Sequence, residues 1–295
     1  MKKVGDTIKR EAMFYEELDD KKIHCYLCPH NCVIEDGDVG KCSVRLNEDG
    51  KLFSTNYMEI TAITTDPIEK KPLKFFKKGS NILSVGTFGC NLTCSFCQNY
   101  SIAQFTDYHA HSQRITKEEL VDSALHTTNN IGIAFTYNEP TIWYEYVYET
   151  AKLLKEKDGN KSVVIVTNGF INKEPLEKLL PFVDAMNIDL KGFSNEYYTN
   201  ICGGRLNPVL ETIKLAAENT HVEITTLLVT GENDNLDEIE ELAKFLGDID
   251  KTIPLHLTRY FPMYKMDNPA TDIDLMYKAK EVAEKYLDRV VLGNV

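Results

Sequence analysis

Short apolar runs recur along the chain from residue 81 onward. They occupy residues 81–85, 132–135, 163–166, 185–189, 222–229 and 255–258. These runs are apolar on both faces and contain many β-branched residues, which is typical of buried strands in a parallel sheet. A further run at residues 290–292 is a candidate seventh strand.

Helical periodicity fills the intervals between these runs. Thr116 and Glu119 form a capping-box pattern, which predicts a helix that starts there and continues to Thr128. Apolar residues at helical spacing predict further helices around residues 143–154, 207–219, 236–246 and 275–286.

Strands that alternate with helices indicate right-handed βαβ units and a parallel sheet in an α/β fold. Six such units fit a complete or partial β/α barrel, and a doubly wound open sheet is the competing architecture. In both architectures ligands gather at the carboxyl ends of the strands. We expect residues 81–295 to form this core and residues 1–80 to form a small cysteine-rich extension.

Composition narrows the classes of function. The chain has 295 residues, a net charge of −12 and 43% hydrophobic residues, enough for a sizeable core. The acidic balance argues against binding to nucleic acid or to an anionic membrane. No signal-peptide core lies in residues 1–20, and no apolar run approaches the ~18–20 residues of a membrane span. We therefore expect a soluble, cytoplasmic protein.

Seven of the eight cysteines fall in two short stretches, residues 25–42 and 90–97, and Cys202 stands apart. A reducing cytosol disfavours disulfides, and tight cysteine clusters there usually bind metal. Cys202 is expected to be a small buried residue, with a reactive thiol as the alternative.

The second stretch has the spacing C-x3-C-x2-C and directly follows the first core strand. Cys90, Cys94 and Cys97 can ligate three corners of a cubane iron–sulfur cluster, whereas structural zinc normally takes four ligands. The fourth iron would then be open to a small molecule. The alternatives are three reduced cysteines, or a zinc site that a distant histidine completes.

This loop resembles that of the radical S-adenosylmethionine (SAM) enzymes. Within that superfamily the chain is similar to activating enzymes of glycyl-radical proteins, such as the pyruvate formate-lyase-activating type, and most similar to the radical SAM member of the AmmeMemoRadiSam system. The segments behind this resemblance are Cys-Gln-Asn-Tyr-Ser-Ile (97–102), Phe-Thr-Tyr-Asn-Glu-Pro-Thr (135–141), Val-Thr-Asn-Gly (166–169), Asp-Leu-Lys-Gly (189–192) and Ile-Cys-Gly-Gly (201–204).

The resemblance implies a partial (β/α)6 TIM-like barrel and a [4Fe–4S] cluster whose open iron binds SAM. One-electron reduction would cleave SAM to a 5′-deoxyadenosyl radical, which removes a hydrogen atom from a protein, a peptide or a small molecule. A low-potential flavodoxin or ferredoxin is the expected electron donor.

Polar residues at the strand ends are the cofactor contacts that the resemblance implies. They are Asn99, Asn138, Glu139, Thr167, Asn168 and Asp189. Relatives often carry Gly-Gly where this chain has Tyr137 and Asn138. The alternatives are that Glu139 merely begins a helix and that Asn168 belongs to an ordinary Asn-Gly turn.

Four residues are candidates for the chemistry itself. Asp189 and Lys191 are two apart at the end of the fourth strand and should point to the same face. His256 and Arg259 end the sixth strand, where an arginine can clamp a carboxylate or phosphate. A buried histidine with no catalytic role is the alternative for His256.

The first cysteine stretch has the spacing C-x2-C-x3-C-x9-C. Cys25, Cys28, Cys32 and Cys42 can close a tetrahedral shell, so zinc is one expectation. An auxiliary [4Fe–4S] cluster is the other, because a neighbouring cluster needs electrons.

We expect a radical SAM enzyme. A true glycyl-radical activase is the first alternative, and a non-catalytic metal-binding or electron-transfer protein is the second.

Overall fold

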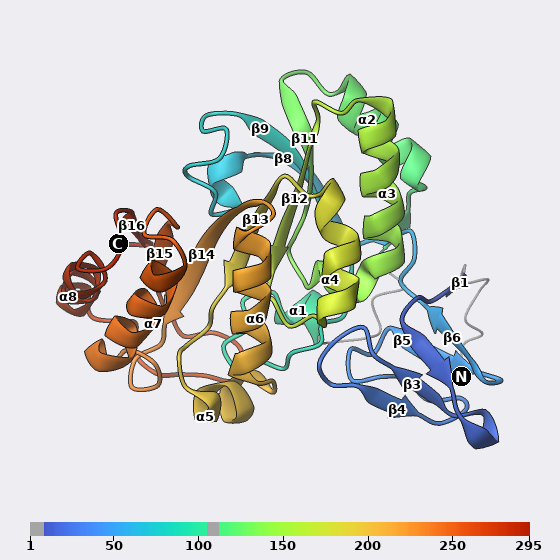
Figure 1. The fold of residues 1–295 in the computed structure, drawn as a ribbon, viewed down its shortest axis with the longest axis horizontal. Helices are drawn as coiled ribbons and strands as arrows, with labels where there is room; N and C mark the ends of the chain where they lie inside the picture. Colours follow the sequence, from blue (N-terminus) through green and yellow to red (C-terminus); the bar gives the residue numbers. More distant parts are fainter. Residues whose placement is uncertain (1–8, 105–111) are drawn as a thin grey trace.

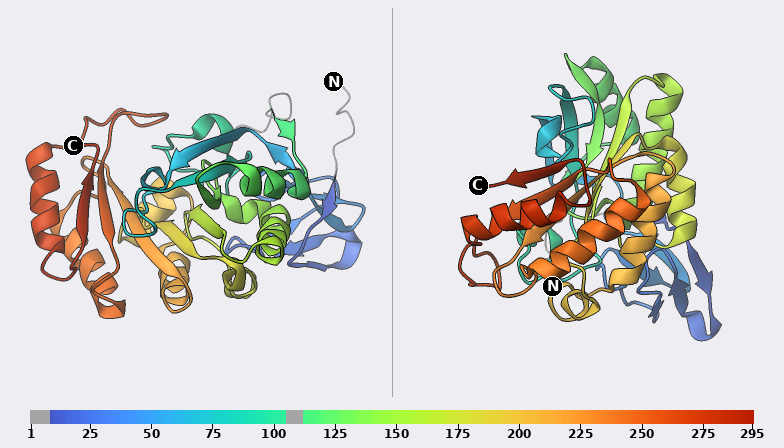
Figure 2. Two further views of the ribbon diagram at one scale, coloured as in Figure 1. Left: turned by 90° about the horizontal axis from the view of Figure 1, so that it is seen from above. Right: turned by 60° about the vertical axis from the view of Figure 1, so that its left-hand side comes forward.

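The fold is built around one curved, mostly parallel sheet (Figures 1 and 2). The computed structural model describes residues 9–104 and 112–295. The strand order is β16-β15-β14-β13-β12-β11-β9-β8. The parallel strands are β9 (Asn81–Gly86), β11 (Asn130–Phe135), β12 (Ser162–Thr167), β13 (Ala185–Asp189), β14 (His221–Leu228), β15 (Leu255–Arg259) and β16 (Val290–Gly293). All seven predicted strands are therefore confirmed.

Helices connect successive parallel strands and gather along one side of the sheet (Figure 2, left). They are α2 (Lys117–His126), α3 (Tyr144–Lys157), α4 (Lys173–Leu179), α6 (Leu206–Ala217), α7 (Leu236–Ile249) and α8 (Ile273–Ala283). A doubly wound sheet would carry helices on both faces. The sheet stays open, with β16 and β8 as its edges, so the architecture is the partial β/α barrel.

Two elements of the core were not predicted from periodicity. The short helix α4 has seven residues and carries Pro175 in its first turn, so no helical stripe is visible in the sequence. The edge strand β8 (Ala62–Pro67) pairs antiparallel with β9, although it lies in the segment expected to form the extension. The predicted capping box at Thr116 and Glu119 is confirmed.

The N-terminal residues form small antiparallel sheets beside the barrel, coloured blue in Figure 1. One contains β1 (Arg10–Glu11), β6 (Lys51–Ser54) and β5 (Arg45–Glu48), and another contains β2 (Tyr15–Glu17), β3 (Ile23–Cys25) and β4 (Cys32–Ile34). A two-stranded sheet joins β7 (Glu59–Ile60) to β10 (Gln113–Arg114).

A buried ion pair attaches this extension to the barrel. Arg45 Nη2 lies 2.8 Å from Glu145 Oε1 on α3, and both side chains are 1% exposed. The Met13 amide donates to the same carboxylate oxygen at 2.7 Å. The strand β5 and the bend that contains Met13 therefore both contact one charged side chain of the barrel.

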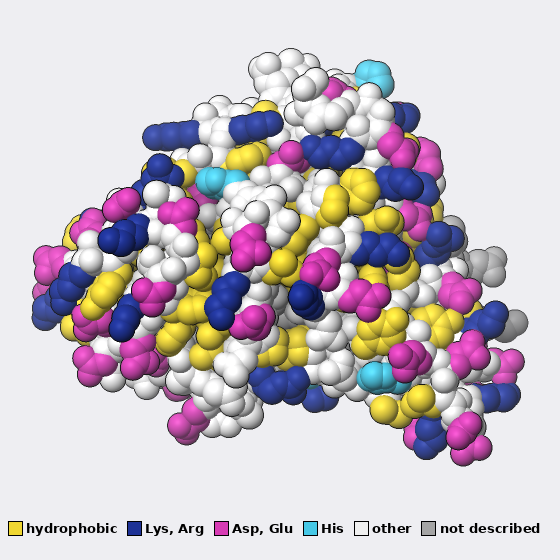
Figure 3. All heavy atoms as spheres, viewed as in Figure 1, with side chains coloured by type: hydrophobic (Ala, Val, Ile, Leu, Met, Phe, Trp, Pro, Cys, Tyr) yellow, Lys and Arg dark blue, Asp and Glu magenta, His cyan; other side chains and the backbone are white. Residues whose placement is uncertain are grey.

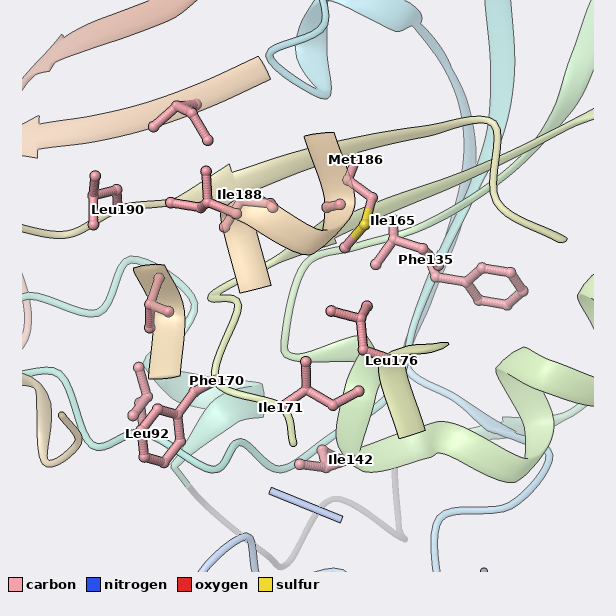
Figure 4. Packing of buried hydrophobic residues seen from close by; sticks show 14 of the residues in the cluster. Leu92, Phe135, Ile142, Ile165, Phe170, Ile171, Leu176, Met186, Ile188 and Leu190 are labelled. Atoms are coloured by element: carbon pink, nitrogen blue, oxygen red, sulfur yellow. The ribbon is translucent and has the colours of Figure 1, made fainter. Parts of the chain in front are cut away.

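The hydrophobic core extends from the sheet into the loops at the carboxyl ends of the strands. Figure 4 shows Ile165 and Met186 on the strands, with Leu92 and Phe170 in the loops beyond them. Apolar packing therefore fixes the loops as well as the sheet, which limits their freedom to rearrange.

The surface offers no continuous basic track on the face shown in Figure 3, where Lys and Arg alternate with Asp and Glu. Among the described residues, no helix combines the length and apolarity that crossing a membrane requires.

We predict that Glu145→Ala destabilises the protein by about 3–5 kcal/mol, because it leaves the Arg45 guanidinium buried without its counter-charge. Denaturant unfolding would measure the change. The matched control is Glu211→Ala, which removes the exposed partner of Lys214 and should cost less than about 1 kcal/mol. Equal losses in the two variants would contradict the prediction.

Candidate functional site

The C-x3-C-x2-C loop lies at the carboxyl end of β9. Cys94 is buried, and Cys90 and Cys97 are partly buried. Two donors approach the Cys90 sulfur: the Leu92 amide at 3.4 Å and Asn168 Nδ2 at 3.7 Å. Burial raises the pKa of Cys90 well above its usual value, and the hydrogen bond from the Leu92 amide opposes this by favouring the thiolate, which is the form that binds iron.

A tight turn after β13 packs against this loop and brings in Cys202. The turn is a π-helix (Tyr198–Cys202) that follows α5 (Asn195–Tyr197). Its Cys202 carbonyl accepts from the Thr93 amide at 2.8 Å. Gly203 has φ 72°, and a Cβ there would lie 2.2 Å from Thr93 Oγ1, so the approach requires glycine.

The contact places the Cys202 thiol beside Cys94. A hydrogen bond from the Cys202 thiol lowers the pKa of Cys94, while burial raises the pKa of Cys202 well above its usual value. Spacing alone does not reveal that a fourth cysteine adjoins the loop. The expectation that Cys202 is buried is confirmed.

Asp189 and Lys191 form an ion pair next to the same cysteines, at 3.0 Å between Oδ2 and Nζ. Burial opposes the charge on Lys191, but Asp189 and the neighbouring thiols raise its pKa well above the ordinary value. Lys191 in turn acts to lower the pKa of Cys94 and Cys97. Within the pair, Lys191 places its positive charge beside the cysteine loop, and Asp189 acts in the opposite direction on the same thiols.

Glu139 connects the ends of β11 and β12. Its side chain is buried, and burial raises its pKa, opposed by hydrogen bonds from neighbouring donors. The Thr167 hydroxyl donates to Oε1 at 2.6 Å and the Asn168 amide donates to Oε2 at 2.7 Å. Glu139 also accepts from the Thr141 amide at 3.0 Å and so caps the short 3-10 helix Pro140–Trp143. It therefore does begin a helix, as the alternative interpretation held, and it also positions the end of β12.

Asn168 carries that positioning into the cysteine loop. Its Oδ1 accepts from the Phe170 amide, which makes a local turn, and its Nδ2 donates to Asn91 Oδ1 at 2.9 Å as well as approaching Cys90. Asn91 was not singled out from the sequence, although its place inside the cysteine motif is a signal that could have found it.

Tyr137 adopts a backbone conformation that favours glycine. Its φ is 74°, in the left-handed region. Its side-chain hydroxyl donates to Asp66, and its carbonyl accepts from Asn99 Nδ2. The adjacent Asn138 accepts from the Thr87 amide at 3.0 Å and donates to the Gly89 carbonyl at 2.9 Å. Asn99 and Asn138 thus both hold the backbone around the loop.

His256 lies near the amino end of β15, away from these strand ends. Its Nε2 is 2.6 Å from Glu223 Oε2, and both side chains are buried. Glu223 also accepts from the Phe75 amide, in the loop that precedes β9. The structure thus places His256 in a buried hydrogen-bonded pair with Glu223. Arg259 does lie at the carboxyl end of β15, where its Nε donates to the Thr271 carbonyl.

The four N-terminal cysteines line one pocket. Cys25 and Cys32 are register partners on the antiparallel strands β3 and β4, while Cys28 lies in the turn between them and Cys42 precedes β5. Arg45 lines the same pocket. Its Nε is buried and has no hydrogen-bond partner.

Both groups of cysteines supply thiol ligands of the kind that a metal–sulfur centre uses. Within residues 9–104 and 112–295, no group of three or more His, Cys, Asp or Glu is arranged to hold one metal ion. The positive charge of Lys191 and the donors to Cys90 suit an anionic iron–sulfur group at Cys90, Cys94 and Cys97.

Comparison with known proteins agrees with an iron–sulfur site on this loop. The model of the Radical SAM superfamily matches residues 84–246, more than half of the chain. An uncharacterized protein of Methanocaldococcus jannaschii is 43% identical over 97% of this chain and 85% of its own length. The pyruvate formate-lyase 1-activating enzyme of Escherichia coli is 26% identical over 69% of this chain and 88% of its own length.

A solved structure shows the same fold. The radical SAM methyltransferase from Sphaerobacter thermophilus superposes with a TM-score of 0.56 over 74% of this chain and 67% of its own, at 17% identity.

The Glu223 network yields a prediction on pH. Burial alone would raise the pKa of Glu223, but hydrogen bonds from His221, His256 and the Phe75 amide lower it to about 2. A carboxylate whose pKa is depressed in the folded state stabilises the protein above its unfolded pKa of about 4.3. We expect this contribution, roughly 3 kcal/mol, to disappear as the pH falls from about 4.5 to 2.

The measurement is the free energy of unfolding against pH for the wild type and Glu223→Gln. The difference between them should be largest near neutral pH and shrink across that acidic window. Glu211→Gln, at an exposed carboxylate, is the control and should track the wild type. A difference between wild type and Glu223→Gln that stays constant with pH would contradict the assignment.

Proposed function

The chain belongs to the radical SAM superfamily, and from that premise we propose that it binds a [4Fe–4S] cluster through Cys90, Cys94 and Cys97 and cleaves SAM reductively. When bound, the cluster and SAM supply a 5′-deoxyadenosyl radical that takes a hydrogen atom from a substrate. The observation that carries the proposal is that three features lie together at the carboxyl ends of the parallel strands. They are these thiols, the Asp189–Lys191 pair and the Glu139–Asn168 network.

The protein's own residues have distinct tasks in this proposal. Asn168 donates toward Cys90, and Lys191 places positive charge beside Cys94 and Cys97. Glu139 fixes Thr167 and Asn168 and so acts as a positioning residue.

Asp189 is partly exposed beside this site and is the proposed contact for the amino acid group of SAM. Asn99, Asn138 and Thr167 shape the surrounding backbone. Arg259, at the carboxyl end of β15, remains a proposed substrate-side residue. For His256, buried against Glu223 near the amino end of that strand, we propose the alternative, a buried histidine with no catalytic role.

We propose a cytoplasmic enzyme that receives single electrons from a low-potential flavodoxin or ferredoxin. We also propose a second metal centre, zinc or an iron–sulfur cluster, at Cys25, Cys28, Cys32 and Cys42, supported by the pocket that these four cysteines share.

Cys202 provides the sharpest test, because a fourth thiol ligand would close the iron position that SAM requires. We expect Cys94→Ala to lose 5′-deoxyadenosine formation after anaerobic reconstitution and reduction with dithionite. We expect Cys202→Ala to keep the iron and acid-labile sulfide of the wild type, since three thiolates suffice. The measurements are metal and sulfide content, 5′-deoxyadenosine yield and the change that SAM causes in the electron paramagnetic resonance (EPR) signal.

If Cys202→Ala loses a cluster while its circular dichroism is unchanged, Cys202 is a ligand and the open iron position is refuted. If Cys94→Ala forms as much 5′-deoxyadenosine as the wild type, the cluster assignment itself is wrong.

Glycyl-radical activation is a second candidate, supported by the relative named as a pyruvate formate-lyase 1-activating enzyme. It predicts that the reduced enzyme with SAM leaves a glycine-centred radical on a protein partner, visible by EPR. Incubation with an extract of the source cells, with and without SAM, would measure it. A protein or small-molecule product that forms without any such radical would exclude this candidate.

A further inference from the structure

The pocket of the four N-terminal cysteines contains one buried N–H donor without an acceptor, on the side chain of Arg45. The Arg45 side chain is 1% exposed, and its Nη atoms reach Glu145 and the Met13 carbonyl. Its Nε, in the same pocket as Cys25 and Cys42, has no hydrogen-bond partner. A buried N–H without an acceptor is unfavourable, so this donor indicates that the pocket takes an acceptor with negative charge.

A metal core bound by four thiolates carries net negative charge and presents sulfur atoms as acceptors. Such a core would accept a hydrogen bond from the Arg45 Nε, while Glu145 remains the counter-charge of the guanidinium. Apolar side chains of Leu27, Ile34 and Ile142 line the rest of the pocket, which would shield the core from water. The lining therefore suits a buried metal–sulfur centre.

Four thiolates in one pocket are the usual ligand set of structural zinc and equally of a [4Fe–4S] cluster. Zinc has no redox chemistry, whereas a cluster exchanges single electrons. What separates the two is therefore whether the pocket lies where an electron carrier would be useful.

The two cysteine loops are in direct contact. His30, between Cys28 and Cys32, donates from Nε2 to the Asn91 carbonyl at 2.7 Å. On the other side, a Cβ on Gly89 would come within 2.8 Å of the Cys42 carbonyl, and Gly89 has φ 87°. The two cysteine loops therefore touch at two points, which makes the two sites neighbours. Electron transfer slows steeply with distance, so adjacent sites are the arrangement that a relay requires.

We propose that Cys25, Cys28, Cys32 and Cys42 hold a second [4Fe–4S] cluster that passes single electrons to the cluster at Cys90, Cys94 and Cys97. The relay rests on the proposed function, whereas the second cluster does not. The donor, a reduced ferredoxin or flavodoxin, is oxidised by one electron as the second cluster is reduced. The second cluster is reoxidised when it reduces the catalytic cluster by the same electron.

Metal content tests the second cluster. We compare the wild type with two multiple variants, Cys90→Ala/Cys94→Ala/Cys97→Ala and Cys28→Ala/Cys32→Ala, after anaerobic reconstitution. Each variant should retain about half of the iron and acid-labile sulfide of the wild type. After reduction, the EPR signal of the triple variant should be insensitive to SAM, and that of the double variant should respond to it.

Zinc without sulfide in the folded triple variant would overturn the proposal, and so would a folded triple variant without metal. If the double variant does not fold, the reduced wild type decides alone. Two EPR signals, one of which ignores SAM, support the second cluster, and a single signal that responds to SAM refutes it.

Electron transfer is tested by rapid mixing with reduced flavodoxin or ferredoxin, followed by freezing and EPR. The signal of the catalytic cluster should appear at a rate at least about tenfold lower in Cys28→Ala/Cys32→Ala than in the wild type. Dithionite, which reaches either cluster directly, should reduce it equally fast in both proteins. Equal rates with the protein donor would refute the relay.

This readout does not depend on SAM cleavage. A wild type that contains both clusters and passes electrons between them, but forms no 5′-deoxyadenosine, would refute the proposed function and leave this inference standing.

Discussion

The buried carboxylate of Glu139 is the interaction on which the candidate site depends. A charged group with 2% exposure is stable only when donors surround it, and Glu139 takes these donors from two different loops. Because the Thr167 hydroxyl and the Asn168 amide are among them, the end of β12 is held in one position. Asn168 can then direct its amide at both Cys90 and Asn91. A chain of polar contacts thus links the start of the 3-10 helix Pro140–Trp143 to the sulfur atom of Cys90.

The sequence predicts the sheet well for a physical reason. Parallel strands covered on both faces must be apolar throughout, so they remain visible as runs without any alignment. The elements that were missed are those whose identity depends on partners elsewhere. The strand β8 is stabilised by pairing with β9, and the π-helix Tyr198–Cys202 by its contact with the cysteine loop.

The same distinction holds at the site. The cysteine positions follow from spacing, since metal ligands on one loop are local in sequence. In contrast, the partners of Arg45 and of His256 are set by contacts across the fold. Arg45 pairs with Glu145 on a distant helix, and His256 pairs with Glu223 on the neighbouring strand. Tyr137 gives a further example, because a left-handed backbone at a non-glycine residue has no signature in the sequence.

The contacts between the N-terminal extension and the barrel have a consequence for the order of events during translation. The contacts of the cysteine turn are far apart in sequence: Arg205 donates to the Pro29 carbonyl, 176 residues away, and Asn172 donates to the Tyr26 carbonyl, 146 residues away. On the ribosome the N-terminal thiols emerge long before the residues that cover them. The docking of this segment therefore has to wait until residues 172 and 205 have been synthesised.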